Sequence, residues 1–137
     1  MRVVIDTNVL ISGLLVKGSA ADDVRRAWER RAFELVTSEW QLDEFRRVSR
    51  YPRLAQRVRP HEFGRLVGRM RRSALVLSDL PAIPVSADPD DDAIVATALA
   101  GDAEWLVTGD AGHLLSLGSV GGIAIVSPRA FLATHRL

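Results

Sequence analysis

The sequence predicts an α/β fold in which a mostly parallel central sheet carries helices on both faces, a three-layer α/β/α arrangement. Short apolar runs rich in β-branched residues alternate along the chain with longer segments of helical pattern. Such alternation is typical of parallel sheets, whose strands are joined by crossover helices. Capping and stop residues at the ends of the helical segments indicate where each one begins and ends.

Four segments are expected to be strands. The first, 3–5, contains only Val and Ile and is too short for a helix, so it is interpreted as a buried strand. The other expected strands are 34–37, 105–108 and 123–126.

Two helices are expected in the first half of the chain. Residues 20–32 follow a helical pattern. Ser38, with Gln41 three residues later, predicts a capping box that opens a helix to about residue 50, and Pro52 interrupts the helical pattern beyond it.

The later helices begin at prolines or capping residues. Pro60 opens a helix to about residue 73, and a looser stretch comes after it. Asp88 is expected to be the N-cap of a helix that has Pro89 at its first position and ends at Gly101. A short turn at 112–117 and a C-terminal helix after Pro128 complete the pattern.

Composition is that of one globular domain spanning residues 1–137. No apolar stretch approaches the roughly 20 residues of a membrane helix, so no membrane association is expected. The N-terminus lacks the pattern of an export signal, and the chain has no cysteine. Both observations favour a reducing, cytoplasmic setting.

Charge is unevenly distributed along the chain. Residues 25–72 hold 14 of the 17 arginines and six acids, a balance of +8, whereas residues 73–137 hold two arginines and eight acids, a balance of −6. A basic half beside an acidic half suits an anionic polymer lying across a metal site. Arginines on solvated helical faces would give the same pattern.

Four acids stand where a strand or helix begins or ends: Asp6, Glu44, Asp91 and Asp110. Residues just beyond the carboxyl ends of parallel strands gather at one edge of a sheet, which is where Asp6 and Asp110 fall. No neighbouring cation is close enough in sequence to neutralise such a group, so a divalent metal is the expected partner. Asp6 and Asp110 also suit helix caps or turns.

The position of an acid around its helix distinguishes a candidate ligand from a solvent-exposed residue. Glu44 projects between Trp40 and Val48 at the margin of an apolar stripe, whereas Asp43 points toward solvent among arginines. An acid on the core side of a helix usually has a cationic partner.

In the acidic run at 88–92, capping residues and candidate metal ligands are harder to tell apart. Asp88 and Asp90 are explained by capping and by the helix dipole. Asp91 shares a face with Ile94 and is preferred as the metal ligand, with Asp92, nearer the edge of the apolar stripe, as the alternative.

Four motifs, in this order, resemble those of PIN-domain nucleases. They are Asp6-Thr7-Asn8-Val9-Leu10, Ser38-x5-Glu44-Phe45, Asp88-Pro89-Asp90-Asp91-Asp92 and Val107-Thr108-Gly109-Asp110. The resemblance covers nearly the whole chain and is closest to the bacterial toxin-like branch, the toxin components of toxin–antitoxin pairs.

The resemblance implies a metal-dependent endoribonuclease with a central parallel sheet. Asp6, Glu44, Asp91 and Asp110 would hold one or two Mg²⁺ or Mn²⁺ ions, with Asn8 and Thr108 as polar supports. It further implies an RNA substrate, a cognate antitoxin protein and a homodimer. The motifs do not distinguish transfer, ribosomal and messenger RNA from one another or from DNA.

Other classes of protein are disfavoured by single residues. A haloacid-dehalogenase-like phosphatase needs a second Asp where this chain has Asn8, and a receiver domain needs a late lysine where the only lysine is Lys17. Glycine-rich phosphate loops and a nucleophile elbow are absent from the sequence. His61 and His135 have no neighbour that suggests a ligand. His113 is close to Asp110 and could line a site, but a solvated loop histidine is the preferred interpretation. A non-catalytic PIN-like module that binds RNA or protein is the remaining alternative.

Overall fold

The computed structural model describes residues 1–84, 88–109 and 114–137. Its sheet has the order β3-β2-β1-β4-β6-β5. The pairs are parallel except for β5 with β6, which is antiparallel. The strands are β1 (Arg2–Ile5), β2 (Glu34–Ser38), β3 (Leu75–Leu77), β4 (Trp105–Val107), β5 (Ser119–Val120) and β6 (Ile123–Val126). The expected central, mostly parallel sheet is confirmed.

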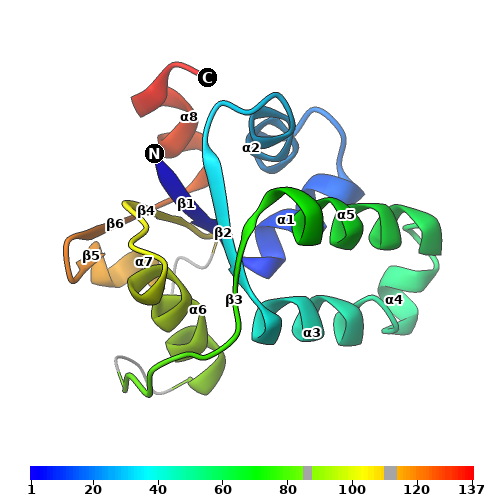
Figure 1. Cartoon of the computed structure of the whole chain (residues 1–137). Coiled ribbons are helices and arrows are strands. Elements are labelled where there is room, and N and C mark those ends of the chain that lie inside the picture. The colour runs from blue at the N-terminus through cyan, green and yellow to red at the C-terminus, as the bar shows by residue number, and fades with distance from the viewer. Residues whose placement is uncertain (85–87, 110–113) are drawn as a thin grey trace.

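Helices cover both faces of this sheet. They are α1 (Thr7–Leu15), α2 (Ala20–Glu29), α3 (Glu39–Val48), α4 (Pro52–Ala55), α5 (Pro60–Ser73), α6 (Pro89–Ala100), α7 (Leu114–Leu117) and α8 (Pro128–His135). Figure 1 shows α6 and α7 on one side of the sheet and α1, α3 and α5 on the other. In the part of the chain that the structure describes, no helix has the length and apolar character needed to cross a membrane.

Alternating side chains of the strands supply two separate cores. In β1, Val3 and Ile5 pack into the core beneath α1, α2, α3, α5 and α8, whereas Val4 packs into the core beneath α6 and α7. Leu106 and Val107 of β4 divide in the same way. The period of two expected of a strand therefore builds a three-layer structure, because successive side chains point to opposite faces.

Several boundaries differ from the expected ones. The helix expected at 20–32 ends at Glu29, because Arg31 adopts a left-handed backbone (φ 63°) and Ala32 donates its backbone N–H back to Ala27. Strands β3 and β5 and helices α1 and α4 were not among the expected elements. The start of the turn expected at 112–117 lies outside the described residues, and α7 covers its end.

The capping box predicted at Ser38 is only half formed. The Ser38 hydroxyl accepts a hydrogen bond from the Gln41 backbone N–H (3.1 Å), as an N-cap should. The Gln41 side chain does not return to Ser38: its Nε2 donates to the Ile5 carbonyl (2.7 Å), and its Oε1 accepts from Thr37 Oγ1 (2.6 Å). Gln41 therefore ties the ends of β1 and β2 together.

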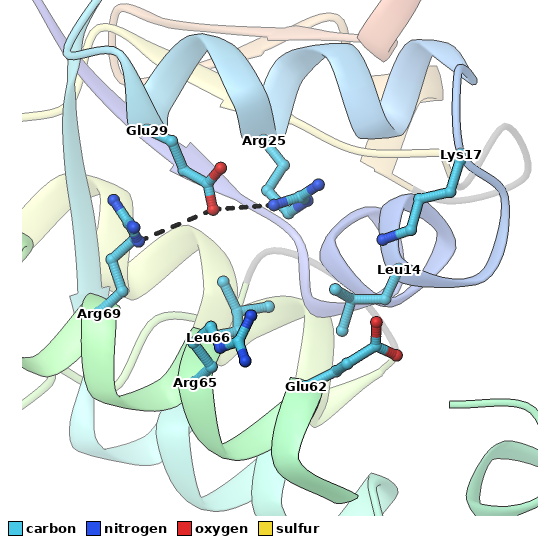
Figure 2. Close-up of a pocket in the computed structure, with 8 residues that line it drawn as sticks. All are labelled: Leu14, Lys17, Arg25, Glu29, Glu62, Arg65, Leu66 and Arg69. Atoms are coloured by element: carbon cyan, nitrogen blue, oxygen red, sulfur yellow. Dashed lines mark hydrogen bonds and ion pairs between the residues drawn. The ribbon is translucent and has the colours of Figure 1, made fainter. Parts of the chain in front are cut away.

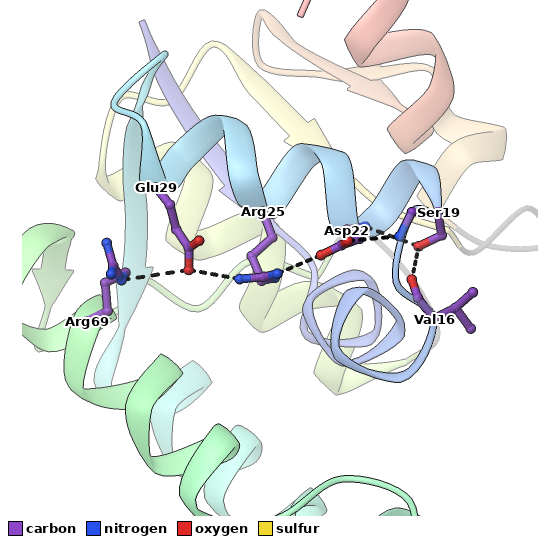
Figure 3. A network of polar contacts seen from close by, with 7 residues as sticks. Val16, Ser19, Asp22, Arg25, Glu29 and Arg69 are labelled. Carbon is purple, nitrogen blue, oxygen red and sulfur yellow. Dashed lines mark hydrogen bonds and ion pairs between the residues drawn. The ribbon is translucent and has the colours of Figure 1, made fainter.

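A chain of paired charges runs along α2 and across to α5. Arg25 donates to Asp22 (2.6 Å) and to Glu29 (2.8 Å), and Glu29 also lies 3.7 Å from Arg69 Nε on α5 (Figure 3). Burial raises the pKa of Asp22, but hydrogen bonds from the Gly18 backbone and from Arg25 outweigh it, and the pKa is lowered overall.

This chain of charges borders a hollow of about 310 Å³ between the two helices (Figure 2). Arg25, Arg69, Lys17 and Arg65 line the hollow, but Arg25 and Arg69 are already paired with Glu29 inside it. The network therefore holds α2 against α5 and leaves these two arginines neutralised within the protein.

Candidate functional site

The order of the strands reverses between β1 and β4, and the first two candidate residues lie at this point. Asp6 follows β1 and donates its backbone N–H to the Val107 carbonyl of β4 (2.8 Å). Thr108 follows β4 and donates its hydroxyl to Asp6 Oδ2 (2.8 Å). Ligand sites of open α/β sheets form at such reversals, because the loops of the two halves diverge there.

Asp6 is 8% exposed, and its side chain makes no capping hydrogen bond to α1. Asp6 does occupy the N-cap position of α1, as the helix-cap alternative predicted, and its backbone carbonyl accepts from the Val9 N–H (2.9 Å), but its side chain takes no part in the cap. Its carboxylate accepts a hydrogen bond from Thr108, one of the two residues predicted to be polar supports of the site. The Asp6 carboxylate is thus directed toward the end of β4 rather than toward the first turn of α1.

Glu44 reaches the site from α3 and lies half-buried at the margin of the helix's apolar face, as its helical phase predicted. Burial raises its pKa, and the nearby charges of Asp90 and Asp6 raise it further, whereas a hydrogen bond from Thr7 and the charge of Arg47 lower it. Asp43, on the opposite side of α3, is exposed and lies 3.5 Å from Arg46.

Thr7 is a site residue that the sequence did not single out. It is 1% exposed and bonds the Glu44 carboxylate, and its hydroxyl also accepts a long hydrogen bond from Gln41 Nε2 (3.4 Å). Thr7 therefore links the Glu44 side chain to the ends of β1 and β2. Its only sequence signal was its place between Asp6 and Asn8, which helix capping explains equally well.

Helix α6 brings in Asp91 and separates it from Asp92. The Asp88 side chain caps the helix by accepting from the Asp90 backbone N–H (2.9 Å), as expected. Asp91 is 9% exposed and faces Asp6 and Glu44, whereas Asp92 lines a different, apolar hollow with Trp40.

The position of α6 is fixed from its other end. The Thr97 hydroxyl donates to the Ala93 carbonyl (2.8 Å) and lies within hydrogen-bond distance of the hydroxyl of Ser38 (3.1 Å), the residue that caps α3. Helices α3 and α6 therefore share one anchor at the end of β2, and this anchor sets Glu44 and Asp91 on the same side of the sheet edge.

One hollow of about 230 Å³ collects these side chains, and we call it the acidic hollow. Its lining carboxylates are Asp6, Glu44, Asp88, Asp90 and Asp91. Asn8 and Arg47 also line it. Three of the four acids singled out in the sequence thus come together, and Asp88 and Asp90, which capping and the helix dipole explained, join them. Asp110 and His113 lie outside the described residues.

The chemistry of this lining fits a hard divalent cation. Within the described residues no three His, Cys, Asp or Glu side chains are grouped tightly enough to hold a metal ion as they stand. The lining nevertheless offers five carboxylates, the oxygen donors that Mg²⁺ and Mn²⁺ prefer. Asp90 and Asp6 already raise the pKa of Glu44, so a bound cation would offset an existing repulsion.

A protein-family model described as PIN domain matches residues 2–112, a span that contains every residue of the acidic hollow together with Thr108. No curated protein matches the chain.

Proposed function

Because the chain belongs to the PIN-domain family, which is generally a nuclease fold, we propose that it is a metal-dependent endoribonuclease. The observation that carries this proposal is the acidic hollow, where Asp6, Glu44 and Asp91 arrive from the end of β1, from α3 and from α6. The packing of these three elements does not require their carboxylates to meet at one point. Burying several carboxylates together is costly without a cation to neutralise them.

Each residue of the site has a distinct role in this proposal. Asp6, Glu44 and Asp91 would hold one or two Mg²⁺ or Mn²⁺ ions, with Asp110 as a fourth ligand. Such an ion would supply polarisation of the scissile phosphate and activation of a water, so that no histidine base would be required. Thr108 orients the Asp6 carboxylate and Thr7 orients that of Glu44. Asn8, which is exposed and lines the acidic hollow, would be a polar support of the site and contact the substrate.

Neighbouring acids of α6 provide a matched test. End-labelled single-stranded RNA is incubated with the parent protein, with Asp91→Asn and with Asp92→Asn, each with Mn²⁺ and with EDTA. The expected result is Mn²⁺-dependent cleavage by the parent and by Asp92→Asn. Substitutions outside the ligand shell of a metal typically reduce activity by roughly 10–100-fold. Asp91→Asn should reduce cleavage by more than this, because it removes a metal ligand.

Two outcomes would change the assignment. Loss of cleavage in Asp92→Asn alone would transfer the ligand role to Asp92. A folded, Mn²⁺-loaded parent that cleaves neither single-stranded nor structured RNA would overturn the nuclease proposal and favour the non-catalytic binding module.

We extend the proposal to a biological role, the toxin of a type II toxin–antitoxin pair. Its support is the order of the four motifs along the sequence. In that role an antitoxin protein would bind over the acidic hollow, and the chain would act as a homodimer. Growth arrest on expression of the parent but not of Asp91→Asn is the expected result, and equal growth of both strains would contradict the role.

A further inference from the structure

A second hollow adjoins the acidic hollow. It has a volume of about 570 Å³ and shares three lining residues with the acidic hollow: Asn8, Val48 and Tyr51. We call it the adjoining hollow. Small-molecule sites in proteins typically measure about 300–1,000 Å³, so this space is large enough for one. Because Tyr51 lines both hollows, a ligand that extends from one into the other can contact its side chain.

Tyr51 places an aromatic ring on this rim. The residue is 51% exposed and precedes α4 as its N-cap. Its backbone is held firmly: the N–H donates to the Val48 carbonyl (3.0 Å), and the carbonyl accepts from Leu54 (2.9 Å) and Ala55 (2.9 Å). The backbone of Tyr51 is therefore fixed, whereas its side chain is exposed and does not belong to the hydrophobic core. A single exposed aromatic residue is ordinary on a protein surface; its place on the boundary of both hollows distinguishes this one.

The walls of the adjoining hollow combine apolar and amide groups. Ile11 and Leu15 of α1 and Leu54 of α4 supply apolar surface, and Asn8 and Gln56 supply side-chain amides. A nucleobase has the matching chemistry, since it presents a flat π face for stacking and hydrogen-bonding groups at its edge.

The charge of the adjoining hollow is positive and not neutralised by the protein. Arg53 and Arg57 line it, no acid does, and within the described residues neither arginine forms an ion pair. Arg25 and Arg69, in the hollow between α2 and α5, are paired instead with Glu29 (Figures 2 and 3). Among the described residues, Arg53 and Arg57 are therefore unpaired cations close to the acidic hollow, where the phosphates that flank a bound metal would pass.

We propose that the adjoining hollow is a nucleotide subsite, in which Tyr51 stacks on the base next to the scissile phosphate of single-stranded RNA. Arg53 and Arg57 contact the phosphates beyond that base. This assignment rests on the proposed function, because the acidic hollow is taken to hold the scissile phosphate. Base stacking on an aromatic ring contributes about 1–3 kcal/mol per base, which corresponds to about 5- to 150-fold in affinity.

The test measures stacking at one position of the RNA. Fluorescence anisotropy with a short single-stranded RNA gives the Kd of Asp91→Asn and of the same protein with Tyr51→Ala or Tyr51→Phe added. A set of RNAs, each lacking the base at one position, is measured in parallel. Tyr51→Ala should weaken binding of the intact RNA about 5- to 150-fold, whereas Tyr51→Phe should bind as tightly as the Asp91→Asn protein.

The coupling between protein and RNA identifies the base. At one position, removing the base should weaken binding by the same factor as Tyr51→Ala, and the two changes together should cost no more than either alone. If the losses in affinity from Tyr51→Ala and from removal of a base multiply at every position of the RNA, this result would overturn the subsite. Unchanged RNA affinity in Tyr51→Ala would do the same, and it would assign this surface to a protein partner if one lost affinity for that variant.

Failure of the subsite is distinguishable from failure of the proposed function. If the parent cleaves RNA with Mn²⁺ but Tyr51→Ala binds RNA normally, only the subsite is wrong. If base-dependent coupling at Tyr51 is found but the parent does not cleave, the subsite stands and the nuclease proposal is wrong. Circular dichroism of both Tyr51 variants confirms that each is folded before binding is compared.

Discussion

The carboxylate of Glu44 carries a free-energy cost that the rest of the fold offsets. Burial, followed by the charges of Asp90 and Asp6, raises its pKa above the ordinary 4.5. Below that ordinary value the folded and unfolded chains both keep the proton, and the group costs nothing. As the pH rises from there through the folded pKa, the unfolded state releases its proton first, so stability falls and the full cost is present above the folded pKa.

We expect Glu44→Gln to raise the melting temperature in EDTA at pH 7 and to leave it nearly unchanged at pH 4. Glutamine keeps an oxygen to accept from Thr7 but carries no charge. Each pKa unit of the shift corresponds to about 1.4 kcal/mol, so the difference between the two pH values measures it. Thermal unfolding is followed by circular dichroism.

A neighbouring acid serves as the control. Asp43→Asn changes the same charge on the exposed side of α3, where the Asp43 side chain is 69% exposed, and should leave the melting temperature almost unchanged at both pH values. Added Mn²⁺ should then stabilise the parent more than Glu44→Gln, because a ligand that binds only the folded state raises its stability. A lower melting temperature for Glu44→Gln in EDTA at pH 7 would contradict the account of Glu44.

Helical phase was enough to orient Glu44 and Asp91 from sequence, because each stands next to apolar residues whose burial fixes the face of its helix. The partners of these acids could not be predicted in the same way. Thr7 meets Glu44, and Thr108 meets Asp6 across 102 residues, only once the sheet is assembled. Tyr51 is of interest because it lines both hollows, and no local sequence pattern predicts that position.

At the scale of elements, α1 and α2 approach each other at Gly13. A Cβ at this position would lie 3.1 Å from the Ala21 carbonyl oxygen and 3.2 Å from Asp22 Cα, both backbone atoms of α2. The first turn of α2 cannot shift easily to make room. Ser19 caps it, and the Asp22 carboxylate is held by the Gly18 N–H (2.9 Å) and by Arg25.

Two glycines in helices should therefore respond in opposite directions to alanine. Gly64→Ala, in α5 with nothing within 4 Å of the added Cβ, should stabilise the protein by about 0.5–1 kcal/mol through helix propensity. Gly13→Ala should destabilise it by about 1–3 kcal/mol, since overpacking exceeds that gain. Urea unfolding of both variants measures the two changes, and stabilisation by Gly13→Ala would show that α2 is free to move.

The elements that were predicted well from the sequence are helices whose first or last residues are marked by proline, capping residues or glycine. Helix α5 runs from Pro60 to Ser73 as expected, and α6 runs from Pro89 to Ala100 between its Asp88 cap and Gly101. Strand β3, at Leu75–Leu77, has only three half-buried residues and exists because β2 offers an edge to pair with. The two-residue β5 likewise depends on β6, so neither is visible in a local pattern.

For the whole molecule, the basic half of the sequence is not uniformly available to an anion. Arg25 and Arg69 are paired with Glu29, Arg46 with Asp43, and Arg71 with Glu39. Arg53 and Arg57, beside the acidic hollow, have no such partner in the described part of the chain. Net charge alone therefore overstates how much of the surface would attract RNA.

The salt dependence of RNA binding should separate these two groups of arginines. Replacing Arg53 and Arg57 with Ala in the Asp91→Asn protein should reduce the slope of log K against log salt by about 1.4, because each phosphate contact on a single strand contributes about 0.7. Replacing Arg46 and Arg71 removes the same charge and should change the slope much less. Equal changes in the two double variants would show that only total charge matters.

The link between Asp6 and β4 also sets an order of events during synthesis. An unfinished chain already contains Asp6 and Glu44, but it lacks α6 with Asp91 until residue 100 and lacks Thr108 until later still. Strand β1 cannot gain β4 as its neighbour before that point. The acidic hollow is therefore completed only after Thr108 has been added, and a ribosome making this protein is not exposed to a finished site on any shorter chain.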